Sequence, residues 1–275
     1  MISEALLRQN QDDCFQISAD TDIHRELSQL CHDLAEHPLL MQLARGCFAP
    51  AEVAWIYRRR KTIVDSFLPM LSLAQQMAEA AGRVELVRAL QINIADEMGL
   101  NPDTGQETGE GAHAEWGKRL SSALDLLDPP ALKSCHLSRL PAESWDPYPI
   151  DPQDSLAVIV GMIMATEKCI PIEYQAFLKG FRIAFPSFAD PSNEDCLRQL
   201  TDHIDHDERQ HLPDLIDGYL GHSPGTRGEV LALDALQRSE ATDLARGMER
   251  ILSLRYNFYD SLQHLFDQLS PVTQG

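Results

Sequence analysis

Residues 156–166, Leu-Ala-Val-Ile-Val-Gly-Met-Ile-Met-Ala-Thr, form the most apolar stretch of the chain. Eleven residues are too few for a membrane-spanning helix, which needs about 20, and they suit a helix buried inside a protein. Elsewhere the apolar residues recur at steps of three and four, as at Ile23, Leu27 and Leu30. No window alternates in the way that a strand requires. The sequence therefore predicts an all-α fold.

Local start and stop signals divide the chain into about seven predicted helices. Pro50 suits the first turn of a helix, whereas Gly99 and Gly221 each follow a periodic run and suit a helix end. The predicted helices span residues 22–36, 50–81, 83–98, 112–127, 155–185, 193–220 and 227–268. The long loops at 100–111 and 128–153 are equally typical of binding lids and of plain connections.

Composition and charge narrow the classes of function. A chain of 275 residues with 44% hydrophobic content can bury a substantial core, and we expect one domain over residues 1–275, with 1–20 as a candidate flexible segment. A net charge of −19 argues against partners such as nucleic acids or anionic membranes, which require a basic face. A small-molecule substrate is the expected partner.

The N-terminal residues and the cysteines indicate the compartment. The first thirty residues carry neither a signal-peptide core nor a transit-peptide composition, so we expect a cytoplasmic protein. The cysteines are far apart and never form Cys-x-x-Cys, which argues against zinc ribbons and disulfide scaffolds. We expect all six to be reduced: Cys14, Cys31, Cys47, Cys135, Cys169 and Cys196.

The densest cluster of polar residues is Thr-Asp-His-Ile-Asp-His-Asp-Glu-Arg-Gln-His at 201–211. On an α-helix each step from His203 to Asp207 to His211 advances about 400°, so the three side chains share one face. A solvent-exposed polar stretch is the simpler interpretation. However, apolar neighbours such as Leu200 continue the same face. Burying these groups costs several kcal/mol, which a bound cation would offset.

A metal site needs ligands from other helices as well. Glu97 and Glu167 each lie in an otherwise apolar helix, although Asp96 competes with Glu97, and an ion pair is the alternative role for Glu167. Pro171 would free the backbone carbonyl of Glu167 and kink the helix there. His113, at the start of the next helix, is a further candidate nitrogen ligand.

Several segments resemble the heme-oxygenase-like fold. They are His-Pro-Leu-Leu-Met-Gln-Leu-Ala-Arg-Gly at 37–46, Ala-Pro-Ala-Glu-Val at 49–53 and Ser-Phe-Leu-Pro at 66–69. This fold includes the TenA-type thiaminases, the pyrroloquinoline quinone synthase C proteins and the heme-oxygenase-like di-iron oxidases and oxygenases. The resemblance implies a helical bundle that usually forms a homodimer.

The di-iron branch is distinguished by a Glu, a His, a second Glu and a helix with His-x-x-x-Asp and a closing His. The resemblance therefore implies this ligand set: Glu97, His113, Glu167, His203, Asp207 and His211. In the family the closing His often follows the Asp by three residues, where this chain has Gln210. His211, His206 and Gln210 are therefore all candidates for the sixth ligand. The loop before His113 is also longer than in the family, so one stably held iron is the alternative to two.

The resemblance implies an O2-dependent, non-heme di-iron oxidase or oxygenase. Carboxylates and imidazoles suit Fe(II), and O2 would be the co-substrate of a small amino acid, amine or fatty acid. Three alternatives come from other classes. They are a TenA-like thiaminase with Cys135 or Cys169 as nucleophile, a cofactorless oxidase of the quinone-synthase type, and a non-catalytic interaction protein.

Overall fold

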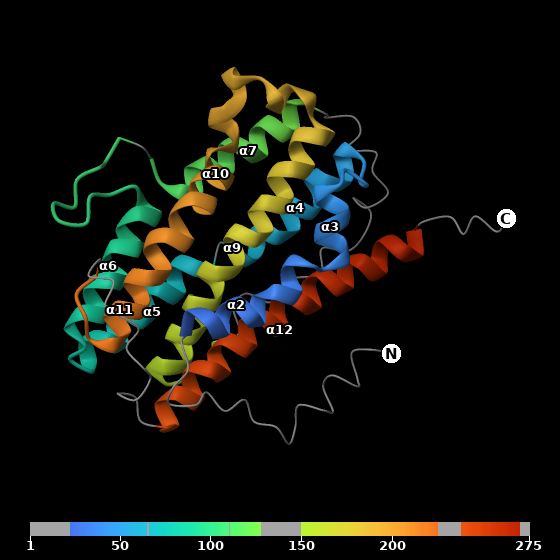
Figure 1. The fold of residues 1–275 in the computed structure, drawn as a ribbon. Helices are drawn as coiled ribbons and strands as arrows, with labels where there is room; N and C mark the ends of the chain where they lie inside the picture. The colour runs from blue at the N-terminus through green and yellow to red at the C-terminus, as the bar shows by residue number, and fades with distance from the viewer. Residues whose placement is uncertain (1–22, 65, 110, 128–149, 225–237, 270–275) are drawn as a thin grey trace.

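The structure, a computed structural model, describes residues 23–64, 66–109, 111–127, 150–224 and 238–269. Residues 1–20, predicted as a flexible segment, lie outside these ranges. Apart from one isolated β-bridge between Leu100 and Glu107, all regular structure in the described residues is helical (Figure 1). The predicted all-α fold class is confirmed.

The described residues form a bundle of α-helices with three short segments of other helical types. Its α-helices are α2 (Ile23–Ala35), α3 (Pro38–Ala44), α4 (Pro50–Val64), α5 (Phe67–Ala80), α6 (Val84–Met98), α7 (His113–Leu127), α9 (Leu156–Ala184), α10 (Arg198–His206), α11 (Leu212–Leu220) and α12 (Arg238–Leu269). Two 3₁₀ segments, η2 (Pro186–Ala189) and η3 (Pro191–Leu197), and the π-helical segment η4 (Asp207–His211) complete it.

Several predicted boundaries need correction. The helix expected over 50–81 is two helices, α4 and α5, because Pro69 is tolerated in the first turn of α5 but cannot continue a helix from α4. The helix expected over 193–220 is divided among η3, α10, η4 and α11. The short helix α3, which begins at Pro38, was not predicted.

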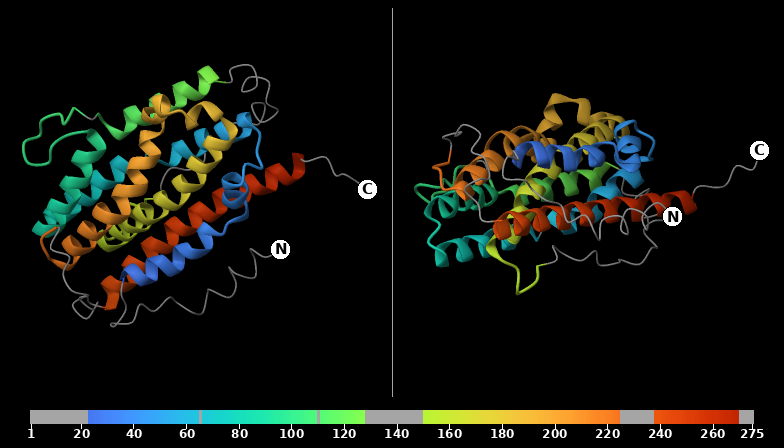
Figure 2. Two further views of the ribbon diagram at one scale, coloured as in Figure 1. Left: turned by 45° about the horizontal axis from the view of Figure 1, so that its top comes forward. Right: turned by 60° about the horizontal axis from the view of Figure 1, so that its bottom comes forward.

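Helix α9 forms the centre of the bundle, with α12 and α2 on one side and α10 and α6 on the other (Figure 1, Figure 2). Its apolar stretch 157–166 is buried along its whole length, as predicted. The backbones of α9 and α12 touch where they cross. A Cβ atom on Gly161 would lie 2.1 Å from the carbonyl oxygen of Leu244, and one on Gly247 would lie 2.0 Å from that of Val158.

A buried charged cluster joins three helices in this core. Glu173 on α9 accepts a hydrogen bond from Nε of Arg60 on α4 at 2.7 Å and from Nη1 of Arg255 on α12 at 3.0 Å. All three side chains are at most 1% exposed. Such a cluster tolerates no loss of a partner, because the remaining charges would be buried uncompensated.

Two further expectations concern membranes and cysteines. None of the helices in the described ranges is both long and apolar enough to cross a bilayer. Cys31, Cys47, Cys169 and Cys196 are free thiols, as expected. Cys14 and Cys135 lie outside the described residues.

Candidate metal centre

Two groups of possible metal ligands meet between α6, α7 and the segment from α10 to η4. Each group contains two imidazoles and one carboxylate, and we call them the Glu97 triad and the Asp96 triad. Their members are Glu97, His113 and His203 in the first, and Asp96, His206 and His211 in the second. Because Asp96 and Glu97 are adjacent, their side chains leave α6 about 100° apart and reach different histidines.

The Glu97 triad is the more buried of the two. Oε1 of Glu97 lies 3.2 Å from Nδ1 of His113 and 3.7 Å from Nε2 of His203. The three side chains are 14%, 6% and 2% exposed, respectively. His113 is the first residue of α7, so the start of this helix lies against Glu97. Helix α6 ends at Gly99, which has a φ of +68°, so the chain turns directly after the two carboxylates.

The Asp96 triad lies closer to solvent. Oδ2 of Asp96 is 3.0 Å from Nε2 of His211 and 3.5 Å from Nε2 of His206. The side chains of Asp96 and His206 are 25% and 34% exposed, whereas that of His211 is 2% exposed. The ring centroids of His206 and His211 are 4.5 Å apart.

The π-helical segment η4 explains why these two histidines meet. On an α-helix, residues five apart point about 140° away from each other. In a π-helical turn the backbone hydrogen bonds join residues five apart, so His206 and His211 lie on one face. Pro213 accounts for the wider turn, because it cannot donate to the carbonyl of Arg209 four residues earlier and its ring would clash there.

The six residues predicted as ligands are placed as follows. Glu97, His113 and His203 come together in one triad, and His211 belongs to the other rather than sharing a single face with His203. Asp207 lies in η4, but its side chain is outside the described part of the structure.

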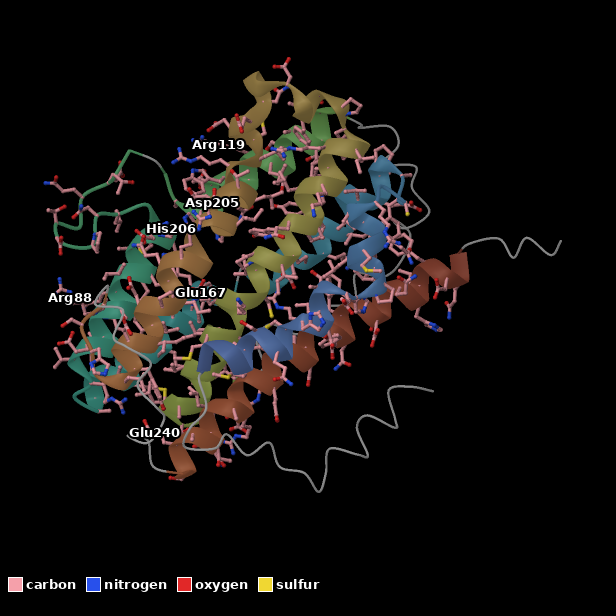
Figure 3. All side chains as sticks on the ribbon, viewed as in Figure 1. Arg88, Arg119, Glu167, Asp205, His206 and Glu240 are labelled. Atoms are coloured by element: carbon pink, nitrogen blue, oxygen red, sulfur yellow. The ribbon has the colours of Figure 1, made fainter. Side chains whose placement is uncertain are left out.

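Glu167, the remaining predicted ligand, lies beside the Asp96 triad and in neither set. It is 1% exposed, and its Oε2 is 3.9 Å from Nδ1 of His211. Figure 3 shows Glu167 on α9 and His206 on α10 in the same part of the bundle. Asn93 of α6 donates a hydrogen bond through Nδ2 to Oε1 of Glu167.

The sequence prediction missed two members of the Asp96 triad. Asp96 was treated only as a competitor of Glu97, and His206 only as one candidate for the sixth ligand. The pair of adjacent carboxylates, together with histidines five residues apart just before Pro213, was the available signal.

The carboxylates of both triads are negatively charged. Burial raises the pKa of both Asp96 and Glu97, but their contacts with the imidazoles outweigh it and hold both pKa values well below the usual range. Both carboxyl groups are therefore ionised at neutral pH. Asp202 adds a third carboxylate, with Oδ2 3.7 Å from Nε2 of His113. The second nitrogen of a metal-bound histidine commonly faces a carboxylate in this way.

The spacing of the ligand atoms also fits a metal. Nδ1 of His113 and Nε2 of His206 are buried, and neither makes a hydrogen bond of good geometry with a described residue. Two ligands at right angles on a metal, each about 2.1 Å from it, lie about 3.0 Å apart. The nitrogen–oxygen distances within the triads run from 3.0 to 3.7 Å, which corresponds to ligand angles of about 90° to 125° at such a metal. The shortest of them, from His211 to Asp96, is a hydrogen bond in this structure. The residues present therefore fit two metal ions.

A cavity of about 110 Å³ gives access to both triads. It is lined by triad residues, by the loop that follows α6 and by the start of α7: Asp96, Gly99, Leu100, Thr108, Gly111, His113, Trp116, Asp202 and His206. The loop closes tightly, since a Cβ on Gly99 would lie 2.5 Å from the carbonyl carbon of Gly111. The predicted loop at 100–111 is thus part of the wall of the site.

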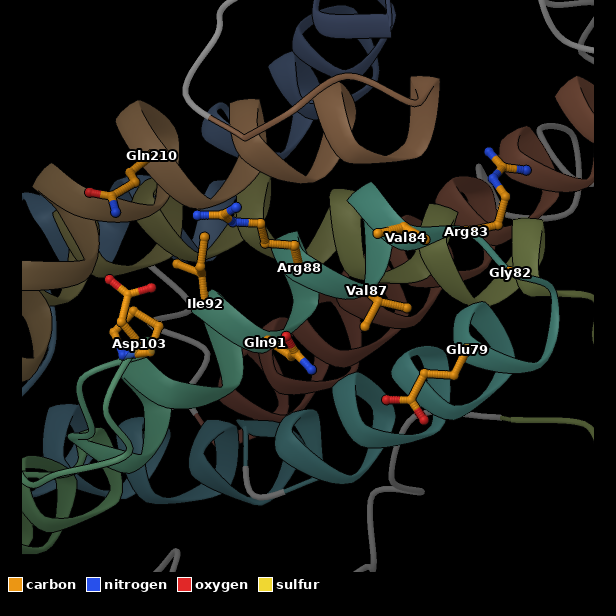
Figure 4. Close-up of a pocket in the computed structure, with 11 residues that line it drawn as sticks. Glu79, Gly82, Arg83, Val84, Val87, Arg88, Gln91, Ile92, Asp103 and Gln210 are labelled. Atoms are coloured by element: carbon orange, nitrogen blue, oxygen red, sulfur yellow. The ribbon is translucent and has the colours of Figure 1, made fainter.

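A larger cavity, of about 810 Å³, lies along the outer face of α6 (Figure 4). Arg88, Ile92 and Gln210 are among its lining residues, and none of the triad residues is. Ile92 is one helical turn before Asp96, and Gln210 is adjacent to His211. The ligand chemistry nevertheless belongs to the smaller cavity, where the carboxylates and imidazoles converge.

Comparisons with known proteins support the fold. No protein-family model matches the chain, and no curated protein matches it. Among solved structures, it is similar to a CADD-like protein of unknown function from Nostoc punctiforme, with a TM-score of 0.60 and 17% sequence identity. The match covers 88% of this chain and 96% of that one. At this identity the likeness shows a shared helical fold.

Proposed function

We propose that this protein is a non-heme iron oxidase or oxygenase that binds two Fe(II) ions and uses O2. The observation that carries the proposal is the pair of triads, each with two histidines and one carboxylate, joined by the adjacent Asp96 and Glu97. Two histidines and one carboxylate are the ligand set of many non-heme Fe(II) oxygenases, and they leave metal positions open. The absence of thiolates from both triads disfavours softer metals.

The chain's own residues would hold the ions and shape access to them. The Glu97 triad would hold one ion and the Asp96 triad the other, with Glu167 beside the second. When bound, the two ions would supply the electrons that reduce O2. The buried Trp116, whose ring centroid lies 4.7 Å from that of His113, excludes water from one wall. A cavity of about 110 Å³ admits O2 and only the reacting end of a small substrate.

We further infer that the chain belongs with the heme-oxygenase-like di-iron oxidases and oxygenases. The order of Glu97, His113, Glu167 and His203 along the chain supports this assignment, and so does the helical bundle. The proposal includes a small amino acid, amine or fatty acid as substrate, a homodimer and a cytoplasmic location.

A thiaminase-like reaction is less consistent with the site. Cys169, one of its two candidate nucleophiles, is fully buried, with its Sγ 3.9 Å from Sγ of Cys31. Hydrogen bonding with Cys31 and burial raise the pKa of the Cys169 thiol well above its usual range. A reactive cysteine needs the opposite shift and an accessible sulfur. Cys135, the other candidate, lies outside the described residues.

Iron analysis of single-triad variants tests the proposal. After anaerobic loading with Fe(II) and removal of free metal, we expect two ions per chain in the wild type and one in each of His113→Ala and His211→Ala. His264→Ala is the matched control, because His264 is an exposed histidine on α12 and should leave the iron content at two. A wild type without iron, or triad variants with unchanged iron, would contradict the proposal.

A further inference from the structure

We propose that Asn93 is a positioning residue for Glu167 and that it strengthens metal binding at the Asp96 triad through this carboxylate. The inference rests on the proposed function, since it assumes that the triads bind metal ions. Asn93 belongs to neither triad and was not among the predicted site residues.

Asn93 lies on α6, the helix that carries both triad carboxylates. It precedes Asp96 by three residues and Glu97 by four, so it lies on the same side of the helix as both carboxylates. Its side chain is buried, with 2% of its surface exposed, in contact with the equally buried Glu167 of α9. Asn93 thus links the helix that carries both triad carboxylates to the central helix of the bundle.

A hydrogen bond joins Asn93 to Glu167. Nδ2 of Asn93 donates to Oε1 of Glu167, and the other oxygen, Oε2, faces Nδ1 of His211 at 3.9 Å. The opposite amide orientation would set two acceptor oxygens against each other, so the donor must face Glu167. The amide therefore fixes the rotation of the carboxylate and directs Oε2 toward the Asp96 triad.

Glu167 and Glu173, six residues later on α9, are both buried carboxylates. Glu173 lies between two guanidinium groups, those of Arg60 and Arg255, which balance its charge. The hydrogen bond from Asn93, in contrast, comes from a neutral amide, which orients the Glu167 carboxylate without cancelling its charge. Asn93 can therefore act on Glu167 only by orienting its carboxylate.

The amide oxygen of Asn93 is unsatisfied within the described part of the structure. Oδ1 of Asn93 is buried and has no hydrogen-bond partner among the described residues. A buried acceptor without a donor destabilises the folded protein, so packing alone does not account for an amide here. A role in holding Glu167 does account for it.

A double-mutant cycle with Co(II) as probe tests the inference. The variants are Asn93→Leu, which keeps the branching at Cγ but has no donor, Glu167→Gln and the double variant. Co(II) binding to the metal-free protein is followed by visible absorption. The thermal unfolding midpoint of each metal-free variant serves as the control for folding. We expect Asn93→Leu to weaken binding of one Co(II) about 10- to 100-fold, as the loss of outer contacts does at other metal sites. In the Glu167→Gln background, Asn93→Leu should have no further effect.

Two backgrounds with a single triad locate the effect. In His113→Ala, which retains the Asp96 triad, Asn93→Leu should weaken the binding of the remaining Co(II) ion. In His206→Ala, which retains the Glu97 triad, it should leave Co(II) affinity unchanged. If the leucine variant does not fold, the same measurements are made on Asn93→Ala.

The outcomes separate this inference from the proposed function. Additive effects of Asn93→Leu and Glu167→Gln, or full Co(II) affinity in Asn93→Leu, would overturn the role of Asn93 while wild-type binding stands. A lower thermal midpoint with unchanged Co(II) affinity would show a merely structural role and would also overturn it. Absence of Co(II) binding by the wild type would overturn the proposed function, and this inference with it.

Discussion

His206 and His211 are five residues apart, yet both face Oδ2 of Asp96, at 3.5 and 3.0 Å respectively. The π-helical segment η4 makes this possible, because its backbone hydrogen bonds join residues five apart. The geometry of the Asp96 triad is therefore sensitive to the length of this segment.

Insertion of one alanine between Gln210 and His211 tests that dependence. With His206 and His211 six residues apart, their side chains should point about 120° away from each other on an α-helix, and about as far apart in a π-helical turn. We expect the iron content to fall from two ions per chain to one, as measured by metal analysis after anaerobic loading. Gln210→Ala keeps the length and should retain both ions. Two stably bound ions in the insertion variant would contradict the role of the five-residue spacing.

Asp202→Asn tests the outer carboxylate of the Glu97 triad. Oδ2 of Asp202 faces Nε2 of His113 at 3.7 Å, and losing its charge should weaken metal binding about 10-fold. Asp205→Asn is a matched control, because Asp205 is on the same helix and 73% exposed. Co(II) titrations of the two variants should differ. Equal affinities would show that Asp202 does not act through His113.

Glu173→Gln tests the charged cluster in the core. Two buried guanidinium groups would lose their counter-charge, so we expect the free energy of unfolding to fall by about 3–5 kcal/mol in urea denaturation. The metal content of the folded fraction should stay at the wild-type value. The exposed substitution Glu79→Gln should change neither quantity. Wild-type stability in Glu173→Gln would refute the structural role of the cluster.

His37 is expected to make stability depend on pH. Burial lowers its pKa below 6.5 more than the hydrogen bond to Asp260 raises it. The folded state therefore favours the neutral ring, whose Nδ1 accepts a hydrogen bond from the backbone N–H of Leu39. This contribution is fully present above pH 6.5 and is lost as the pH falls through the lowered pKa of the folded state.

Urea unfolding at several pH values between 7.5 and 5 would measure this effect. The wild type should lose stability toward acidic pH, and His37→Asn, which keeps a side-chain acceptor but does not titrate, should lose less. An identical slope in both proteins would assign the pH dependence to other groups.

Local signals explain which parts of the fold were predictable. Helix α9 was predicted within one residue at each end, because Ser155 caps its first turn through the N–H of Val158 and apolar residues fill its length. Helix α6 ends at Gly99 as expected. The division of residues 193–220 was not predicted, because it depends on how Pro213 disturbs the preceding turn.

The site shows the same limit. Glu97, His113, His203 and His211 were predicted as ligands from residue type and order, which can be read directly from the sequence. Their division into two triads was not predicted, because it depends on the register of η4 and on which histidine each of the adjacent carboxylates contacts. Such relations arise between helices rather than within one.

The adjacency of Asp96 and Glu97 has a mechanical consequence. Their Cα atoms are about 3.8 Å apart across one peptide bond, a separation that no movement of the helices can change. Any tilt or shift of α6 must therefore carry one carboxylate of each triad in the same direction. The Glu97 triad and the Asp96 triad are therefore coupled through one peptide bond. A movement of α6 that disrupts one triad should disrupt the other as well.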